Sequence, residues 1–299
     1  MKRSVRIGVL VLAVIMMACL FSGCKKKDDT VTVGSKQFTE NNLLGEIYAQ
    51  LIEAHTDIKV ERKLYLGGTS VCIPAMENKE IDLYVEYSGT AYGEILNLGV
   101  STGYTPDEIY DAVKSGLADI GITFFDPIGI NNTYAIALLR ENAKALGIKT
   151  MSDLAPYSSD MRFGSAHSFM ERLSDGYDTM IELYGYDFAS VQRMDSSLLY
   201  EAIGQGQLDT IVVFSTDSLL VKYDMAILED DLQMFPAYHG APICRTEVLE
   251  AHPELNSVLN MLSGRISDEM MQQLDYQVDV ENKSIESVAA QFLSDNGLA

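Results

Sequence analysis

The chain has 299 residues, with 43 acidic and 22 basic side chains and a formal net charge of −21 at pH 7. This surplus of negative charge argues against nucleic acid as a partner, because phosphate groups would be repelled. The four histidines are scattered, and the sequence has no zinc-ligand spacing, no nucleophile elbow and no phosphate-binding glycine loop with lysine. We therefore expect a protein that is not an enzyme and that holds no cofactor and no metal.

The amino terminus has the pattern of a secretory signal. Three basic residues precede an apolar stretch over residues 7–21, which is too short for a comfortable membrane span. The sequence F-S-G-C then resembles a bacterial lipobox, with Phe21 where leucine is usual; the alternative is that Cys24 is an ordinary leader residue. We expect a signal peptide over 1–23, lipidation of Cys24 and a solvated tether over 24–30. The protein would then be exported and anchored by lipid to the outer face of the bacterial cell membrane.

The remainder of the chain reads as alternating strands and helices. About 270 residues follow the leader, which is more than one ordinary core requires and suggests two lobes. Strand-like runs lie at 31–33, 58–66, 81–85, 121–125, 133–139, 191–194 and 210–214. Helical patterns separate these runs, and this order predicts an α/β fold.

Helix starts are indicated by capping residues ahead of apolar repeats. We expect Thr39 to cap one helix, Thr105 with Pro106 to open another, and Ser152 to cap a short turn. Apolar residues also recur at helical spacing near the carboxyl end, at Ile285, Val288, Ala289 and Phe292.

Two cysteines, Cys72 and Cys244, lie in the globular part of the chain. Outside the cytoplasm they could form one disulfide, or they could be two buried free thiols. Spacing in the sequence does not decide between these alternatives.

Three tyrosines crowd into residues 84–92, in a chain that has no tryptophan. Before them, apolar residues alternate as in a buried strand, and S-G-T over 88–90 has the chemistry of a turn and a helix start. Tyr87 is therefore expected at the carboxyl end of a strand, where open α/β sheets bind ligands. An aromatic face beside a helix amino terminus can hold a molecule with a cationic and an anionic end. The alternative is a tyrosine packed in the core.

Three ordered segments then resemble a known family. They are V-G-S-K-Q-F-T-E over 33–40, L-G-G-T over 66–69 and I-D-L-Y-V-E-Y-S-G-T-A over 81–91, and the similarity continues through 126–135, 175–177, 214–217 and 235–238. The chain resembles the osmoprotectant-binding proteins of ABC importers, which are receptors for glycine betaine, carnitine and choline.

This resemblance implies a two-lobed, type II periplasmic-binding-protein-like fold with the ligand cleft between the lobes. Lobe 1 would comprise residues 31–129 plus 237–299, with a helical return over 247–298, and lobe 2 would comprise residues 130–236. Turn-forming residues support crossings near these positions, because Pro127 and Gly129 precede a new strand pattern and Pro236 follows an acidic stretch.

The resemblance also implies an aromatic cage. A quaternary ammonium group has no N–H donor, so aromatic faces recognise it better than a hydrogen-bonded carboxylate does. Matching motifs place the cage at Tyr87, Tyr134, Phe214 and Tyr238. Phe214 stands where the family usually has tyrosine, which keeps an aromatic face and loses a hydroxyl.

The candidates for binding an anionic end are Thr90, Arg172, and either Lys36 or Gln37. Arginine offers a bidentate fork, although Arg172 could instead be a surface residue paired with a neighbouring acid. Threonine at position 90 resembles the receptors for carboxylated ligands, which favours a betaine over choline. Asn132 stands where some relatives carry an acid near the ammonium group.

We therefore expect a monomeric binding protein that closes on its ligand and delivers it to an ABC permease with its cytoplasmic ATPase. Within this class, a bulkier betaine such as ergothioneine is an alternative ligand. A sensory lipoprotein with the same fold is the other alternative, because fold does not dictate use.

Overall fold

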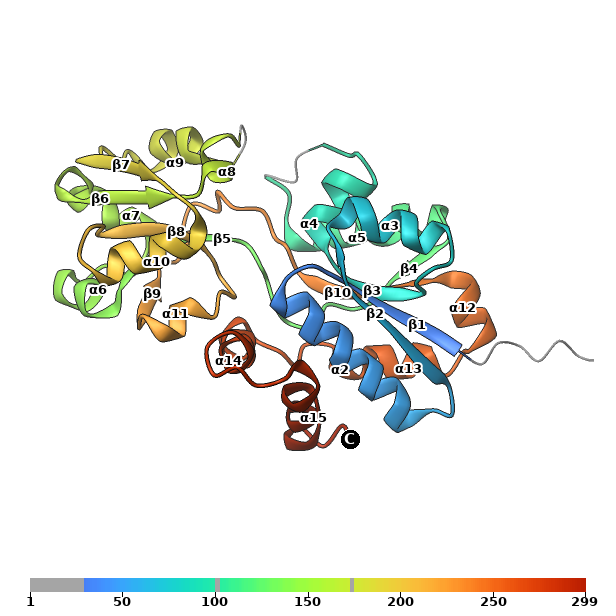
Figure 1. Ribbon diagram of the computed structural model, residues 1–299. Coiled ribbons are helices and arrows are strands. Elements are labelled where there is room, and N and C mark those ends of the chain that lie inside the picture. Colours follow the sequence, from blue (N-terminus) through green and yellow to red (C-terminus); the bar gives the residue numbers. More distant parts are fainter. Residues whose placement is uncertain (1–29, 100–102, 173–174) are drawn as a thin grey trace, which may run out of the picture. The chain divides into compact units, whose positions relative to one another are not determined.

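Figure 1 shows the computed structural model, which describes residues 30–99, 103–172 and 175–299. The predicted signal peptide and Cys24 lie outside these residues. Residues 31–299 form one compact unit. Within the described residues, no helix is both long enough and apolar enough to cross a membrane.

The described strands form two five-stranded sheets, which confirms the predicted α/β class. The first sheet, in the order β2-β1-β3-β10-β4, contains β1 (Thr30–Lys36), β2 (Lys59–Gly67), β3 (Leu83–Tyr87), β4 (Ile122–Phe124) and β10 (Gly240–Arg245). The second sheet, in the order β7-β6-β8-β5-β9, contains β5 (Tyr134–Leu139), β6 (Arg162–Ser165), β7 (Ser190–Arg193), β8 (Thr210–Phe214) and β9 (Met225–Ile227). The chain therefore leaves the first sheet after β4 and returns to it at β10.

The helices follow in chain order. Those between the strands of the first sheet and before β5 are α2 (Thr39–His55), α3 (Thr69–Glu77), α4 (Ser88–Thr90), the π-helix η1 (Ala91–Ile95) and α5 (Pro106–Asp119). Among the strands of the second sheet are α6 (Arg140–Leu146), α7 (Met151–Leu154), the 3₁₀ helix η2 (Ala155–Asp160), α8 (His167–Met170), α9 (Tyr177–Tyr184), α10 (Ser196–Gly204) and α11 (Leu219–Lys222). After β10 come α12 (Thr246–Ala251), α13 (Leu255–Leu259), the 3₁₀ helix η3 (Asn260–Leu262), α14 (Asp268–Asp279) and α15 (Ile285–Asp295), which confirms the predicted helical return.

Both faces of each sheet are buried in hydrophobic clusters. In β3, Leu83 and Val85 pack in one cluster while Tyr84 packs in another. Similarly, Ile136 and Ala137 of β5 belong to different clusters. Because successive side chains of a strand point to opposite faces, this division shows helices or loops covering both sides.

The seven predicted strands each overlap an observed strand, whereas β6, β9 and β10 were not predicted. β6 reads R-F-G-S and β9 has three residues, so neither carries a measurable apolar alternation. β10 reads G-A-P-I-C-R, and glycine and proline ordinarily count against a strand. Its pairing with both β3 and β4 depends on residues far away in the sequence.

Two predicted caps are wrong and one is confirmed. Thr39 is the first residue inside α2, and its hydroxyl donates to Asp279 Oδ1 at 2.6 Å instead of capping the helix. Ser152 lies within α7, which is capped by Thr150. Thr105 caps α5 as predicted, and it also forms a capping box with Glu108.

The structure also resolves the cysteine alternatives. Cys72 and Cys244 are both buried and both free. Gly129, in the first crossing segment, has a φ of +121°, and a Cβ there would lie 2.6 Å from the backbone oxygen of Ile266. Glycine is therefore required at this turn.

Candidate ligand-binding site

A cavity of about 600 Å³ is lined by side chains from the elements of both sheets and from α2 and α14. Of the nine predicted binding residues, eight line it: Lys36, Tyr87, Thr90, Asn132, Tyr134, Arg172, Phe214 and Tyr238. Gln37 does not; its side chain is exposed, and its backbone N–H donates to the carbonyl of Gly67. The structure therefore brings together residues that are as much as 202 positions apart, from Lys36 to Tyr238.

Tyr134 and Phe214 form a stacked aromatic pair in the lining. They lie directly opposite each other on β5 and β8, with ring centroids 4.7 Å apart and an interplanar angle of 28°. Phe169 packs behind Tyr134 at 5.2 Å. Phe214 is 37% exposed, which is unusual for phenylalanine at the end of an otherwise buried strand, and it leaves an aromatic surface open to the cavity.

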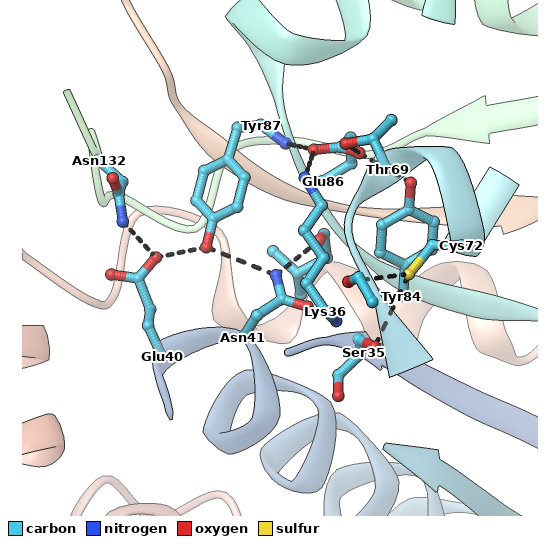
Figure 2. A network of polar contacts seen from close by, with 12 residues as sticks. Ser35, Lys36, Glu40, Asn41, Thr69, Cys72, Tyr84, Glu86, Tyr87 and Asn132 are labelled. Atoms are coloured by element: carbon cyan, nitrogen blue, oxygen red, sulfur yellow. Dashed lines mark hydrogen bonds and ion pairs between the residues drawn. The ribbon is translucent and has the colours of Figure 1, made fainter. Parts of the chain in front are cut away.

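Tyr87 is the last residue of β3, and its side chain packs in the core and also lines the cavity. It belongs to a hydrophobic core cluster, and Phe38, which the sequence reasoning missed, stacks on it at 6.1 Å. Its hydroxyl donates to the carboxylate of Glu40, as Figure 2 shows. Burial raises the pKa of Tyr87 well above its usual value, so the phenol stays protonated and remains a donor.

The position of Tyr238 depends on a glycine in the S-G-T turn. A Cβ at Gly89 would lie 2.7 Å from the Tyr238 ring and 2.9 Å from the carbonyl oxygen of Ala237. Pairing of Gly240 with Tyr87 aligns the start of β10 with the end of β3. The backbone N–H of Tyr238 also donates to Asn131 Oδ1 at 2.7 Å, which fixes this segment beside the strand end.

Lys36 lies in the lining, but its charge is already paired. Its ammonium group is 2.5 Å from Glu86 Oε1, and the Glu86 carboxylate, which is fully buried, also accepts from the hydroxyls of Tyr84 and Thr69. The same ammonium group is 5.1 Å from the centroid of the Tyr87 ring. This network, drawn in Figure 2, holds the Lys36 ammonium group close to the Tyr87 ring.

Arg172 is paired with a neighbouring acid, as one of the two alternatives has it, and it also lines the cavity. Its guanidinium group forms two hydrogen bonds to Asp175, at 2.7 and 2.5 Å, as a paired surface arginine would. It also lies 5.1 Å from the centroid of Tyr134 and 3.4 Å from the hydroxyl of Tyr238. The guanidinium group of Arg172 therefore lies over the ring of Tyr134, which lines the cavity.

Five acidic residues line the cavity and were not predicted: Glu40, Glu94, Asp217, Asp275 and Asp279. Burial raises the pKa of Glu40, Asp217 and Asp275. Asn132, expected beside the ammonium group, donates its amide N–H to Glu40 Oε1 at 3.0 Å. Glu40 and Asp217 lie within the motifs that carry the family resemblance, so the sequence offered a signal for both. Asp275 and Asp279 lie on one face of α14, and only the fold brings that face to the cavity.

Among the residues that the structure describes, no group of three or more His, Cys, Asp or Glu side chains is arranged to hold a metal ion. The lining instead combines aromatic faces, carboxylates and two cations that are each ion-paired. Two helix-covered sheets that share such a cavity define a substrate-binding protein with the type II periplasmic-binding-protein fold.

Comparison with known proteins identifies the family. The family model for the substrate binding domain of the ABC-type glycine betaine transport system matches residues 29–295, and the chain belongs to this family. The carnitine transport binding protein OpuCC of Listeria monocytogenes is 34% identical over 90% of this chain and 87% of its own length. A crystal structure described as a glycine betaine/carnitine/choline ABC transporter, 33% identical, superposes with a TM-score of 0.85 over 90% of this chain and 99% of that chain.

A third relative has a different ligand in its name. The ergothioneine transport permease/ergothioneine binding protein EgtU of Helicobacter pylori is 33% identical over 91% of this chain. The match covers 48% of the length of EgtU.

Proposed function

We propose that this protein is the extracytoplasmic substrate-binding component of an ABC importer and that it captures a quaternary ammonium compound, with glycine betaine or carnitine favoured over choline. The observation that carries this proposal is the meeting of Tyr87, Tyr134, Phe214 and Tyr238 in one cavity. Family membership supports the transport role.

Aromatic faces suit a ligand that cannot donate hydrogen bonds. Each ring contributes roughly 0.5–2 kcal/mol to binding a cation, so several rings supply much of the roughly 8 kcal/mol that micromolar affinity requires. The stacked Tyr134–Phe214 pair lines the cavity from β5 and β8, and Tyr87 and Tyr238 line it from the end of β3 and from the segment just before β10. The trimethylammonium head would sit among these rings.

The carboxylate of a betaine would be bound by Arg172 and Thr90. The guanidinium group of Arg172 presents N–H donors in one plane, a geometry that suits a carboxylate. The Thr90 hydroxyl belongs to the short helix that follows Tyr87. In the structure, Asp175 orients the guanidinium group over Tyr134. A ligand carboxylate would join this arrangement, whereas choline has none to offer, and this difference favours betaines.

Cleavage before Cys24 and lipidation of that residue would tether the monomer to the outer face of the membrane. Closure of the proposed lobes, residues 31–129 plus 237–299 and residues 130–236, would form the surface that the permease, coupled to its ATPase, accepts.

Calorimetric titration of the mature protein with glycine betaine, carnitine and choline tests the proposal. We expect saturable binding with a stoichiometry of one and tighter binding of the two carboxylated ligands. Absence of binding by all three would contradict the proposed class of ligand. The similarity to EgtU makes ergothioneine the second ligand to test in the same assay.

A further inference from the structure

The aromatic rings that line the cavity differ in exposure. A ring attracts a cation through its face, so it contributes to binding only where that face is open to the ligand. Tyr87 is 5% exposed, whereas Phe214 is 37% exposed. Phe38 lines the same cavity and is 38% exposed. The two most exposed rings in the lining are therefore Phe38 and Phe214.

The ring of Tyr87 is already engaged by its neighbours. Its hydroxyl donates to the Glu40 carboxylate, and the Lys36 ammonium group is 5.1 Å from its centroid. Phe38 stacks on it, with ring centroids 6.1 Å apart and an interplanar angle of 29°. A positive charge and a second ring held against Tyr87 leave little of its face for a ligand.

Two stacked pairs of the same composition line the cavity. Phe38 stacks on Tyr87, and Phe214 stacks on Tyr134 with an interplanar angle of 28°. Phe38 directly precedes α2, and Phe214 is the last residue of β8. In each pair the phenylalanine is the more exposed ring and the tyrosine the more buried one. The open aromatic face at the end of β8 thus has a counterpart at the start of α2.

Phe38 also occupies a position that does not favour its residue type. It is the N-cap of α2, with an extended backbone and no side-chain hydrogen bond to the helix. Serine, threonine, aspartate and asparagine are preferred at this position, because their side chains accept from the free N–H groups of the first turn. Phenylalanine loses that hydrogen bond and also leaves apolar surface exposed. A residue that breaks a local rule without a local gain indicates a functional site.

We propose that Phe38 is a ligand-contacting residue, which supplies an open aromatic face to the quaternary ammonium head while Tyr87 supports it by stacking. The head would contact Phe38 and Phe214, one ring from each stacked pair. This inference rests on the proposed function, because an aromatic face suits a cation that has no N–H donor.

Stepwise fluorination of the ring at position 38 tests this contact. Fluorine withdraws electron density from the ring face and weakens its attraction for a cation, while the ring nearly keeps its shape. We expect phenylalanine with one, two and three ring fluorines in place of Phe38 to bind glycine betaine and carnitine progressively more weakly, measured by calorimetry. Phe38→Leu keeps apolar bulk without the aromatic face and should weaken binding by between about threefold and thirtyfold.

Fluorination of Phe188 provides the matched control. Phe188 is partly buried and stacks on Phe163 at 4.7 Å, outside the cavity, so the affinity should stay at the wild-type value. Phe38→Ser separates binding from folding, because serine can cap α2. This variant should fold, as thermal unfolding verifies, and should still bind both ligands more weakly than wild type does.

An affinity that stays constant along the fluorinated series at position 38 would overturn the role of Phe38, as would wild-type affinity in Phe38→Leu. A decline in the same series at Phe214 would then leave the proposed function intact. Wild-type protein that binds neither glycine betaine nor carnitine would overturn the proposed function as well, so the two failures are distinguishable.

Discussion

Tyr134 is the residue at which the proposed cage is tested most cleanly. It is partly buried and faces the cavity beside Phe214, whereas Tyr87 is embedded in a core cluster and hydrogen-bonded to Glu40. We expect Tyr134→Ala to weaken glycine betaine binding by about 1–3 kcal/mol, measured by calorimetry, because one aromatic face and its packing are lost.

Tyr65→Ala is the matched control for this change. Tyr65 is 68% exposed and lies outside the cavity, so its removal should leave the affinity unchanged. An affinity of Tyr134→Ala equal to that of Tyr65→Ala would contradict the aromatic cage.

A second prediction at the residue scale concerns Asp275 and the pH dependence of the free energy of unfolding. Burial, and then the charge of Glu40, raise the pKa of Asp275 well above its ordinary value of 3.8. The folded protein therefore binds this proton more tightly than the unfolded chain does. The resulting stabilisation is complete below the ordinary pKa and is lost as the pH rises toward the raised one.

Asp275→Asn should remove this dependence, because the amide does not titrate. Urea unfolding between pH 4 and pH 8 provides the measurement, because these pH values lie above the ordinary pKa of 3.8. The stability of the variant relative to wild type should rise with pH. A constant difference over this range would mean that Asp275 does not hold a proton in the folded state.

At the scale of elements, the junction between β3 and α4 determines how closely the Tyr238 ring packs against the backbone at Gly89. Gly89→Ala would place a methyl group against the Tyr238 ring and the Ala237 carbonyl. Overpacking of this kind costs about 1–3 kcal/mol, and a rigid backbone oxygen leaves little room for relief. We expect weaker glycine betaine binding and a lower free energy of unfolding, measured by calorimetry and urea titration.

Gly68→Ala supplies the comparison, because a Cβ at Gly68 meets no atom within 4 Å and its φ is −80°. This variant should bind as wild type does. Wild-type binding by Gly89→Ala would show that the position of Tyr238 does not matter for the ligand.

At the scale of the whole molecule, the two sheets are joined where the chain passes from β4 to β5 and from β9 to β10. We propose that these crossings absorb the rotation when the lobes close on a ligand. Small-angle scattering should show a smaller radius of gyration when glycine betaine saturates the protein. Tyr134→Ala at the same ligand concentration should show a smaller change, and an unchanged radius for saturated wild-type protein would contradict closure.

Local patterns in the sequence were sufficient to predict much of the fold of this protein. Long apolar runs predicted the strands that are buried on both faces, and the helix start at Thr105 and the strand end at Tyr87 followed from neighbouring residues alone. The resemblance in ordered motifs predicted the family, which the match over residues 29–295 confirms. It also predicted eight residues that line one cavity, because motif positions in a shared fold carry their spatial relation with them.

Tertiary structure decided what depends on partners distant in the chain. Lys36 is neutralised by Glu86, which is 50 residues away, and β10 becomes a central strand only through pairing with β3 and β4. Asp275 reaches the cavity because α14 packs there, 235 positions after Glu40. Burial and charge pairing are properties of the assembled neighbourhood, so no local pattern in the sequence encodes which of these side chains is neutralised.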